Sequence, residues 1–292
     1  MSAGLLPPAG TSSEFVAGDG MRLHAIAWPA ARPRAAVFLS HGLGEHAGRY
    51  AGLARDFTRR GISLYAVDHR GHGRSGGPRA YVPRFDRFVA DLEDFRRRAD
   101  REAGGVPLFL YGHSLGGLIA LRWLQTHAHV PLAGAVLSAP LLGVKVKAPR
   151  WKLALAAPLS KLLPALPMKN EIDPAELTHD AAYVRSYRED PLVSNRITPR
   201  LFTEMLAAMA GAHAEGGRIS VPLLFLVPGA DTIVDEDATL RFAAGLRGDV
   251  TVRRYPGFRH ESHNEVERDR PLGDVFEWME GKIGGGAGSQ GG

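Results

Sequence analysis

The stretch Tyr111-Gly112-His113-Ser114-Leu115-Gly116-Gly117 decides which fold this chain can adopt. It follows an apolar run at residues 107–110, and the amphipathic pattern of a helix follows it at residues 118–124. A serine in a G-x-S-x-G pattern between a strand and a helix is typical of a nucleophile elbow, a sharp turn that exposes the hydroxyl. The flanking glycines are needed because a Cβ there would collide with neighbouring backbone. The pattern predicts that Ser114 is a nucleophile at the tip of a strand.

Strand and helix patterns alternate along most of the chain. After an N-terminal hairpin, short apolar runs predict strands, and helical periodicity fills the segments between them. Continuous apolar strands that alternate with helices indicate a mostly parallel sheet with helices on both faces. We therefore predict an α/β fold with a mostly parallel eight-stranded sheet. The expected strands are 14–17, 21–28, 36–39, 63–67, 107–110, 133–137, 222–227 and 250–255, and the expected helices are 49–60, 84–102, 115–128, 199–210, 236–246 and 271–282.

The alternation breaks at residues 141–196, where the chain is rich in proline and leucine and has helical character. We predict that this segment is an inserted helical cap, or lid, that covers the sheet. The α/β core is then expected at residues 14–140 and 197–283. Residues 1–13 are expected to be a flexible N-terminus, and the glycine-rich residues 284–292 a disordered tail.

A nucleophilic serine needs a general base, and the base needs an acid that orients it. In a sheet of this kind, reactive groups collect at the carboxyl ends of the strands. Asp231 follows the strand expected at 222–227, and His260 follows the strand expected at 250–255. The chain order serine, acid, histidine is the order that this type of elbow uses.

Neighbouring residues offer alternatives for both roles. His263 competes with His260, but only His260 follows directly after the turn that ends the strand. Asp235 and Asp237 lie near Asp231, but their positions fit the first turn of the next helix, where an acid interacts favourably with the helix dipole. We therefore predict Asp231 and His260 as the partners of the serine.

The loop after the strand at 36–39 predicts a donor for the reaction's oxyanion. Glycines stand on both sides of Leu43 and allow its N–H to turn inward. Together with the N–H of Leu115, directly after the nucleophile, it would form an oxyanion hole. Loss of one such donor typically lowers the rate by about 100- to 1000-fold.

The composition excludes several classes of site. The chain has no cysteine, so disulfides, thiolate metal sites and cysteine nucleophiles are excluded. The net charge is +5, but no basic stripe interleaved with aromatics and no nucleic-acid motif occurs, so we expect no nucleic-acid partner. A group of loop histidines lacks the helical spacing of metal ligands, and we expect no metal and no cofactor. These histidines are His41, His46, His69 and His72.

The N-terminus lacks the features of a signal peptide, and no stretch reaches the roughly 18 apolar residues of a membrane span, so we expect a cytoplasmic protein. Basic residues without any acidic residue gather at residues 141–170, around an apolar stretch at 151–163. This pattern fits a cap helix that packs on its own sheet, or a surface that contacts an anionic membrane peripherally. The basic residues are Lys145, Lys147, Arg150, Lys152, Lys161 and Lys169.

Several blocks in combination resemble the monoacylglycerol lipase family of the α/β-hydrolase superfamily, including its bacterial members. The resemblance covers residues 14–282. It implies the α/β-hydrolase fold, a triad of Ser114, Asp231 and His260, and a mobile helical cap that docks on lipid. The blocks are His41-Gly42-Leu43-Gly44-Glu45-His46 with Gly48-Arg49-Tyr50, then Asp68-His69-Arg70-Gly71-His72-Gly73-Arg74-Ser75, the stretch from Gly112 to Gly117, Gly229-Ala230-Asp231, and His260-Glu261 with Asn264-Glu265.

The resemblance also implies a site for a glycerol head group. Glu45 and Arg49 match polar positions of the family's first block, and Tyr187 matches a tyrosine of its cap. His113, beside the nucleophile, either touches the substrate or only packs. Leu43 and Leu115 match the family's oxyanion donors.

The function that the resemblance implies is hydrolysis of a monoacylglycerol to fatty acid and glycerol through an acyl-enzyme. A broad carboxylesterase or a lysophospholipase would use the same triad, because the fold does not fix the substrate. A non-catalytic lipid-binding protein of this fold would keep the pocket without turnover, and a membrane-surface adaptor would need only the basic cap.

Overall fold

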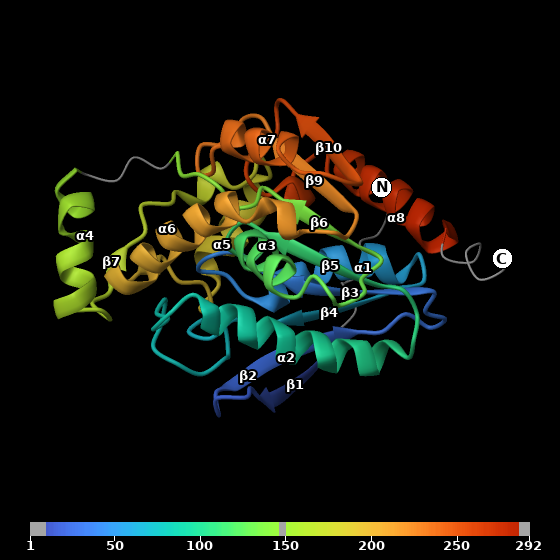
Figure 1. Ribbon diagram of the computed structural model, residues 1–292, viewed down its shortest axis with the longest axis horizontal. Helices are drawn as coiled ribbons and strands as arrows, with labels where there is room; N and C mark the ends of the chain where they lie inside the picture. The colour runs from blue at the N-terminus through green and yellow to red at the C-terminus, as the bar shows by residue number, and fades with distance from the viewer. Residues whose placement is uncertain (1–9, 146–149, 286–292) are drawn as a thin grey trace.

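The computed structural model describes residues 10–145 and 150–285, and one eight-stranded sheet runs through it (Figure 1). Every strand of this sheet except the first starts within one residue of its expected position, because each apolar run is bounded by turn residues. The strands are β1 (Thr11–Val16), β2 (Arg22–Trp28), β3 (Ala35–Ser40), β4 (Ile62–Val67), β5 (Leu108–His113), β6 (Gly134–Ser138), β9 (Leu223–Pro228) and β10 (Val250–Tyr255).

The strand order is β1-β2-β4-β3-β5-β6-β9-β10. The predicted hairpin forms one edge, where β1 and β2 are antiparallel and β2 also pairs antiparallel with β4. All other neighbours are parallel, so the carboxyl ends of β3, β5, β6, β9 and β10 lie at one edge of the sheet. The mostly parallel α/β fold predicted from the sequence is confirmed.

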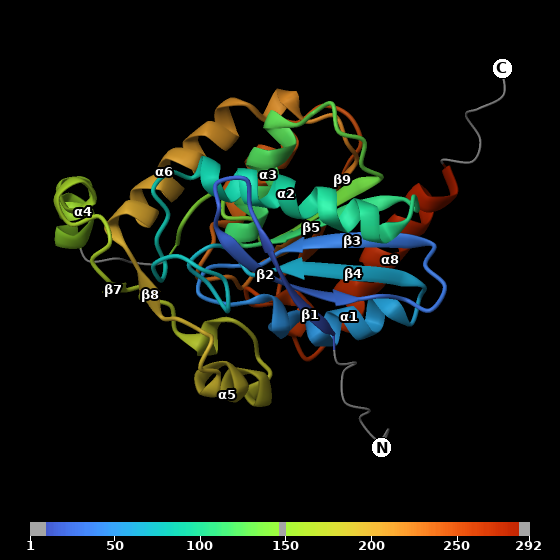
Figure 2. The ribbon, with the colours of Figure 1, turned by 90° about the horizontal axis from the view of Figure 1, so that it is seen from below.

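Helices cover both faces of the sheet (Figure 2). Phe38 of β3 points into a core shared with α2 and α3, whereas its neighbours Val37 and Leu39 point into a second core shared with α1 and α8. Burial on both faces explains why the strands are continuously apolar. The helices of the α/β core are α1 (Ala51–Thr58), α2 (Asp86–Ala103), α3 (Leu115–Thr126), α6 (Pro199–Ala214), α7 (Glu236–Ala244) and α8 (Asp269–Gly285), with the short 3₁₀ turns η1 (Ala47–Tyr50), η3 (Gly216–Arg218) and η4 (Ser262–Asn264).

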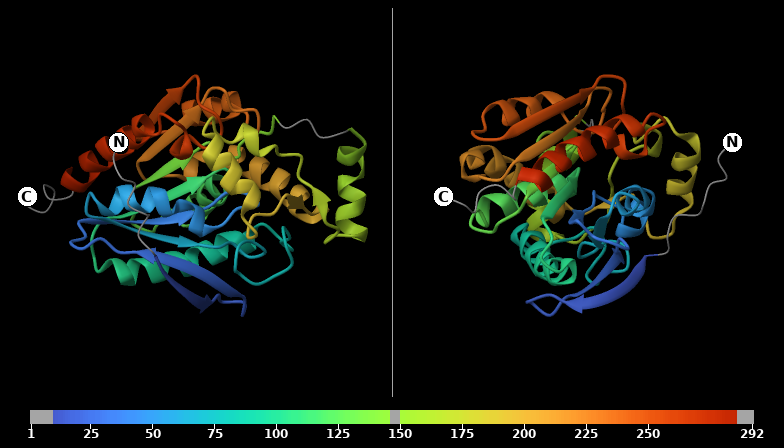
Figure 3. Two further views of the ribbon diagram at one scale, coloured as in Figure 1. Left: turned by 180° about the vertical axis from the view of Figure 1, so that it is seen from behind. Right: turned by 90° about the vertical axis from the view of Figure 1, so that its right-hand side faces the viewer.

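The segment between β6 and α6 forms small elements outside the main sheet. Its first helix, α4, packs against α6 at the end of the molecule opposite α8 (Figure 3). Two short strands, β7 and β8, pair antiparallel with each other. We propose that residues 141–196 form the cap, as expected from the sequence. The elements are α4 (Arg150–Leu162), β7 (Met168–Lys169), η2 (Pro174–Glu176), α5 (Ala181–Glu189) and β8 (Arg196–Ile197).

The two chain ends differ from the expected boundaries. Residues 11–13 belong to β1 rather than to a flexible segment, because their backbone pairs with β2 from Ala27 to Ala25. Gly284 and Gly285 belong to α8 rather than to a disordered tail, because the helix continues past Ile283, which packs on the second core. The rest of both expected segments, residues 1–9 and 286–292, lies outside the described residues.

Candidate active site

Ser114 occupies the sharp turn between β5 and α3. Its φ of 52° and ψ of −119° lie in a region that residues with a side chain rarely adopt. The Ser114 N–H donates to the carbonyl of Ser138 at 3.0 Å, and its own carbonyl accepts the N–H of Leu141 at 3.0 Å. A Cβ on Gly116 would collide with the backbone carbonyl of Ser40, so glycine is required for the close approach of α3 to β3. The strand–turn–helix geometry predicted from the sequence is present.

His260 and Asp231 form a hydrogen-bonded pair beyond the carboxyl ends of β10 and β9. Nδ1 of His260 lies 2.7 Å from Oδ2 of Asp231, and both side chains are buried. The other carboxylate oxygen of Asp231 accepts the N–H groups of Ile233 and Val234 at 2.8 and 3.0 Å. With Nδ1–H donated to the carboxylate, Nε2 of His260 is left as the proton acceptor.

The pair shifts the pKa of both members. Burial by itself lowers the pKa of His260, but the Asp231 carboxylate and its hydrogen bond outweigh burial and hold this pKa above the ordinary 6.5. Burial by itself raises the pKa of Asp231, but His260 and two backbone N–H groups hold it below the ordinary 3.8. Asp231 is therefore ionised at neutral pH and stabilises an imidazolium on its partner.

The alternative residues have other surroundings. His263 is buried, and burial holds its pKa well below the ordinary value, so its ring is neutral. Asp235 is the N-cap of α7 and accepts the N–H of Asp237 at 3.1 Å. Of these acids, Asp231 is the one that hydrogen-bonds His260.

Two cavities meet at Ser114. A pocket of about 20 Å³ is lined by the polar side chains of Glu45, His113, Tyr187, His260 and Glu261 and by the apolar side chains of Leu43, Ile172 and Leu177. A mainly apolar cavity of about 290 Å³ reaches from Ser114 toward α4 and α6. Ser114 and Leu43 line both cavities. The side chains that line the larger cavity include Leu141, Ala156, Met168, Ile197, Phe202, Met205 and Leu206. The larger cavity suits a long apolar group, and the smaller pocket brings polar side chains next to Ser114.

The two expected oxyanion donors lie beside Ser114. Leu43 belongs to the loop after β3, in which the N–H of Gly42 donates to Oε1 of Glu45 at 2.6 Å. Leu115 is the first residue of α3, so its N–H has no partner within the helix. Both backbone segments are fixed before any substrate arrives, which is the condition for effective oxyanion stabilisation.

Several known proteins are similar to this chain in sequence or in structure. A family model described as serine aminopeptidase S33 matches residues 31–267. The monoacylglycerol lipase of Mycolicibacterium smegmatis is 32% identical over 272 residues, which cover 91% of this chain and 95% of that protein. The chain belongs to the monoacylglycerol lipase family of α/β-hydrolases.

Two more relatives support this assignment, one by its sequence and one also by its fold. The monoglyceride lipase of Rattus norvegicus is 32% identical over 275 residues, which cover 92% of this chain and 90% of that protein. The crystal structure of Paleococcus ferrophilus monoacylglycerol lipase has a TM-score of 0.80 and is 33% identical, covering 89% of this chain and 99% of that one. The chain is therefore similar to these three relatives over nearly their whole length.

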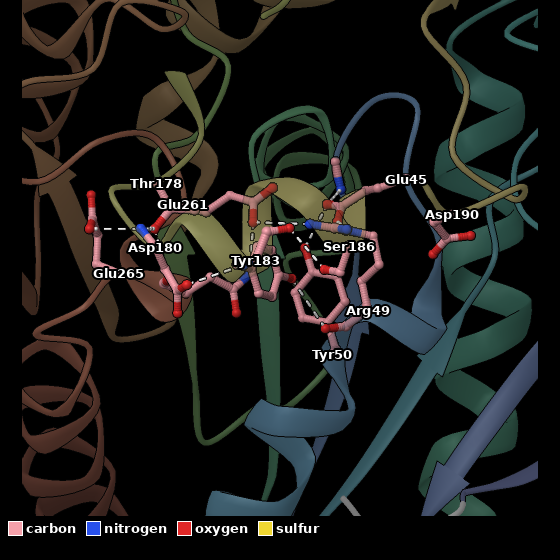
Figure 4. Close-up of polar contacts among 12 residues, drawn as sticks. Glu45, Arg49, Tyr50, Thr178, Asp180, Tyr183, Ser186, Asp190, Glu261 and Glu265 are labelled. Atoms are coloured by element: carbon pink, nitrogen blue, oxygen red, sulfur yellow. Dashed lines mark hydrogen bonds and ion pairs between the residues drawn. The ribbon is translucent and has the colours of Figure 1, made fainter. Parts of the chain in front are cut away.

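The sequence predicts four residues that bind substrate in this monoacylglycerol lipase family member. Three of them line the small polar pocket. They are Glu45, Tyr187 and His113. Arg49 instead contacts two of these pocket residues, with Nε 3.3 Å from Glu45 and Cζ 4.2 Å from the centre of the Tyr187 ring. Figure 4 shows Glu45 and Arg49 side by side.

His113 packs against His260 and the end of β6. Its Nδ1 lies 3.1 Å from the carbonyl oxygen of Ser138, and its ring centre lies 4.8 Å from that of His260. Burial, with a contribution from His260, lowers the pKa of His113 to about 3, so the ring is neutral. His113 can therefore support His260 and face the pocket at the same time.

The sequence-based reasoning missed Glu261 and Tyr183. Glu261 lines the polar pocket and lies 3.4 Å from Arg49. The ring of Tyr183 lies on Arg49 as well, with 4.6 Å from Cζ to the ring centre. The spacing of Tyr183 and Tyr187, four residues apart, would have placed both rings on one face of a helix. Glu261 had a signal too, because it directly follows His260.

The loop histidines have partners within the protein. His69 donates its backbone N–H to Nε2 of His41 at 3.0 Å, and Nδ1 of His72 lies 3.1 Å from the carbonyl of Arg70. In residues 10–145 and 150–285, no group of three or more histidine, cysteine, aspartate or glutamate side chains is arranged to hold a metal ion.

Proposed function

We propose that the protein hydrolyses monoacylglycerols to a fatty acid and glycerol. The observation that carries this proposal is the position of Ser114 between a mainly apolar cavity and a small polar pocket. A monoacylglycerol has one long apolar chain, which matches the larger cavity, and one small polyol, which would meet the polar side chains of the smaller pocket beside Ser114. Membership of the monoacylglycerol lipase family supports the same substrate.

The mechanism assigns one role to each of five residues. Nε2 of His260 takes the proton of the Ser114 hydroxyl as the oxygen attacks the ester carbonyl. Asp231 orients the imidazole and stabilises its protonated form, and the N–H groups of Leu43 and Leu115 stabilise the oxyanion. His260 then gives its proton to the glycerol oxygen, and in the second half-reaction it activates the water that hydrolyses the acyl-enzyme.

We assign the glycerol head group to the polar pocket. Glu45 and Tyr187 offer an acceptor and a hydroxyl there, and His113 forms part of the wall. Arg49 contributes through Glu45 and Tyr187, which it contacts. The acyl chain is assigned to the larger cavity, which reaches from Ser114 toward α4 and α6.

A panel of matched esters tests this function. Initial rates are measured for monoacylglycerols of graded chain length, for methyl esters of the same acids and for a lysophospholipid, with Ser114→Ala as the blank. We expect the glyceryl esters to be preferred, and Tyr187→Phe to reduce that preference because it removes a pocket hydroxyl. Equal rates on glyceryl and methyl esters would identify a broad carboxylesterase instead.

We further propose that the cap contacts membranes peripherally. Leu162 and Leu163 at the end of α4 are 77% and 52% exposed, and the exposed Lys161 precedes them. Apolar side chains beside a cation favour an anionic interface. Among the helices of residues 10–145 and 150–285, none has the length and apolar character for a membrane crossing. The expected basic residue Lys147 lies outside the described residues.

Sedimentation with anionic vesicles tests the membrane contact. We expect the double variant Leu162→Ser with Leu163→Ser to bind vesicles less than the unmodified protein does. Val266→Ser is the matched control, because Val266 is 70% exposed but lies outside the cap. If the double variant and the control bind equally, α4 is not the contact surface.

A further inference from the structure

Part of the cap is attached to the loop that carries the catalytic histidine. Several hydrogen bonds join the segment just before α5 to the loop at residues 259–265. The N–H of Glu261 donates to the carbonyl of Leu177 at 2.8 Å, the hydroxyl of Thr178 donates to the carbonyl of Asn264 at 2.8 Å, and Nδ1 of His179 lies 2.8 Å from Oε1 of Glu265. This part of the cap and the histidine loop therefore form one unit.

Arg49 connects α5 to the same loop from the side of the α/β core. Its guanidinium lies against the rings of both Tyr183 and Tyr187, at 4.6 and 4.2 Å from Cζ to the ring centres. The side chain is only 5% exposed, and Nη2 lies 3.4 Å from Oε2 of Glu261. A cation that stacks on aromatic rings away from water is held more strongly than one at an exposed site. Figure 4 shows Arg49 between Tyr183, Glu45 and Glu261.

Glu261 contacts Arg49 on one side and belongs to the loop of His260 on the other. Its carboxylate accepts from Nδ2 of Asn264 at 2.7 Å in addition to Arg49. It lines the polar pocket together with Tyr187 and directly follows His260 in the chain. A displacement of Glu261 would thus move the wall of the pocket relative to the catalytic base.

We propose that Glu261 is a positioning residue that, through Arg49, holds the cap helix α5 against the loop of His260. The proposal rests on the proposed function, because the wall that it fixes, Tyr187, faces the assigned head-group pocket. A buried ion pair contributes little net stability after desolvation, but removal of one partner leaves an uncompensated charge. The value of this pair therefore lies in the geometry that it imposes.

The charge of Glu261 also reaches His260. The titratable and charged groups around the His260 ring come from several elements, and Glu261 is one of the carboxylates that favour its protonated form. Loss of that carboxylate lowers the pKa of His260, so the base stays deprotonated at lower pH. The groups that interact with His260 are Asp231, Glu261, Glu45, His113 and His263, and Arg49, Tyr183 and Tyr187 interact in turn with Glu261 and Glu45.

The experiment compares three variants on two substrates. Glu261→Gln keeps the shape but removes the charge, and Arg49→Lys keeps the charge but removes the planar group that stacks on the tyrosines. Arg70→Lys is the control, because Arg70 forms a buried pair with Asp91 at 2.6 Å that lines neither cavity. For each, kcat, KM and the melting temperature are measured with a monoacylglycerol and a short aryl ester over a range of pH.

We expect Glu261→Gln to raise KM for the monoacylglycerol about tenfold, the loss of one charge-assisted hydrogen bond, with a much smaller effect on the aryl ester. The acid limb of kcat/KM on the aryl ester is expected to move to lower pH, because this limb reports the pKa of the free enzyme's base. Arg49→Lys is expected to raise KM in the same way, whereas Arg70→Lys lowers the melting temperature only.

Two results separate the proposals. If Glu261→Gln keeps the KM and the acid limb of the unmodified protein and only lowers the melting temperature, as Arg70→Lys does, the pair is a purely structural one and the positioning role is overturned. If the unmodified protein shows no preference for the glyceryl ester over its methyl ester, the proposed function fails. The acid limb on the aryl ester still decides the role of Glu261 in that case.

Discussion

At the scale of single residues, the two oxygens of the Asp231 carboxylate have separate tasks. One accepts Nδ1–H of His260, and the other accepts the N–H groups of Ile233 and Val234. Asp231→Asn keeps the size of the side chain but can present an amide donor where His260 must donate, which favours the wrong tautomer. We expect kcat on a short aryl ester to fall about 10⁴-fold, the loss seen in other triads of this type.

Asp235→Asn is the matched control for this substitution. Asp235 is the N-cap of α7, and asparagine caps helices about as well as aspartate does. We expect its activity to stay within about twofold of the unmodified protein and its stability to change by less than about 1 kcal/mol. If Asp235→Asn lowers kcat strongly and Asp231→Asn lowers it only mildly, Asp235 rather than Asp231 is the acid that orients His260.

The juxtaposition of Asp231 and His260 could be predicted because each directly follows a strand, and parallel strands bring such positions to one edge of the sheet. Tyr183 could not be predicted to contact Arg49 from its neighbours alone. The two residues belong to different elements, and their contact depends on how the cap folds back over the loop before α1. Local patterns do not encode a contact of that kind.

At the scale of elements, the approach of α3 to β3 depends on one missing side chain. A Cβ on Gly116 would overlap the carbonyl oxygens of Ser40 and His41, which are backbone atoms and cannot move aside. We expect Gly116→Ala to lower the free energy of unfolding by about 3 kcal/mol, as overpacking does, and to displace the elbow. Urea unfolding curves and activity on an aryl ester measure the two effects.

Gly273→Ala in α8 is the control, because a Cβ there meets no atom within 4 Å. Alanine is the better helix former by about 1 kcal/mol, so this variant is expected to be more stable than the unmodified protein. If Gly116→Ala and Gly273→Ala shift the urea midpoint in the same direction, the contact of a Cβ at position 116 with the backbone of β3 is not the cause of the lost stability.

Strands show why some element boundaries follow from the sequence and others do not. β4, β5 and β9 are buried along their whole length, so their apolar runs mark where they start. β1 is an edge strand that begins with Thr11, Ser12 and Ser13, which are polar and carry no alternating pattern. Only the backbone of β2 determines that these residues pair, and backbone groups leave no trace in the sequence.

At the scale of the whole molecule, the fold buries several neutral histidines around its catalytic edge. Burial lowers the pKa of His41 and His72 to about 4 and that of His113 to about 3, all below the ordinary 6.5. The folded state therefore leaves these rings unprotonated where the unfolded state protonates them. His260 acts in the opposite sense, because its pKa is raised in the folded protein. The stability that the neutral rings contribute is present above pH 6.5 and is lost as the pH falls toward their folded pKa values.

Acid should consequently weaken the fold well above the pH at which carboxylates protonate. Below pH 6.5 five rings resist protonation in the folded protein, namely His41, His69, His72, His113 and His263, whereas His260 is protonated in both states. Unfolding therefore takes up as many as five protons, and the free energy of unfolding is expected to fall by up to about 7 kcal/mol per pH unit once the pH is well below 6.5. Urea midpoints at closely spaced pH values from about 7.5 to about 5 measure this slope. His129→Gln should leave the slope unchanged, because His129 is exposed. A urea midpoint that stays constant over this range would mean that the buried rings accept protons in the folded state. The hypothesis that these histidines are neutral in the folded protein would then be wrong.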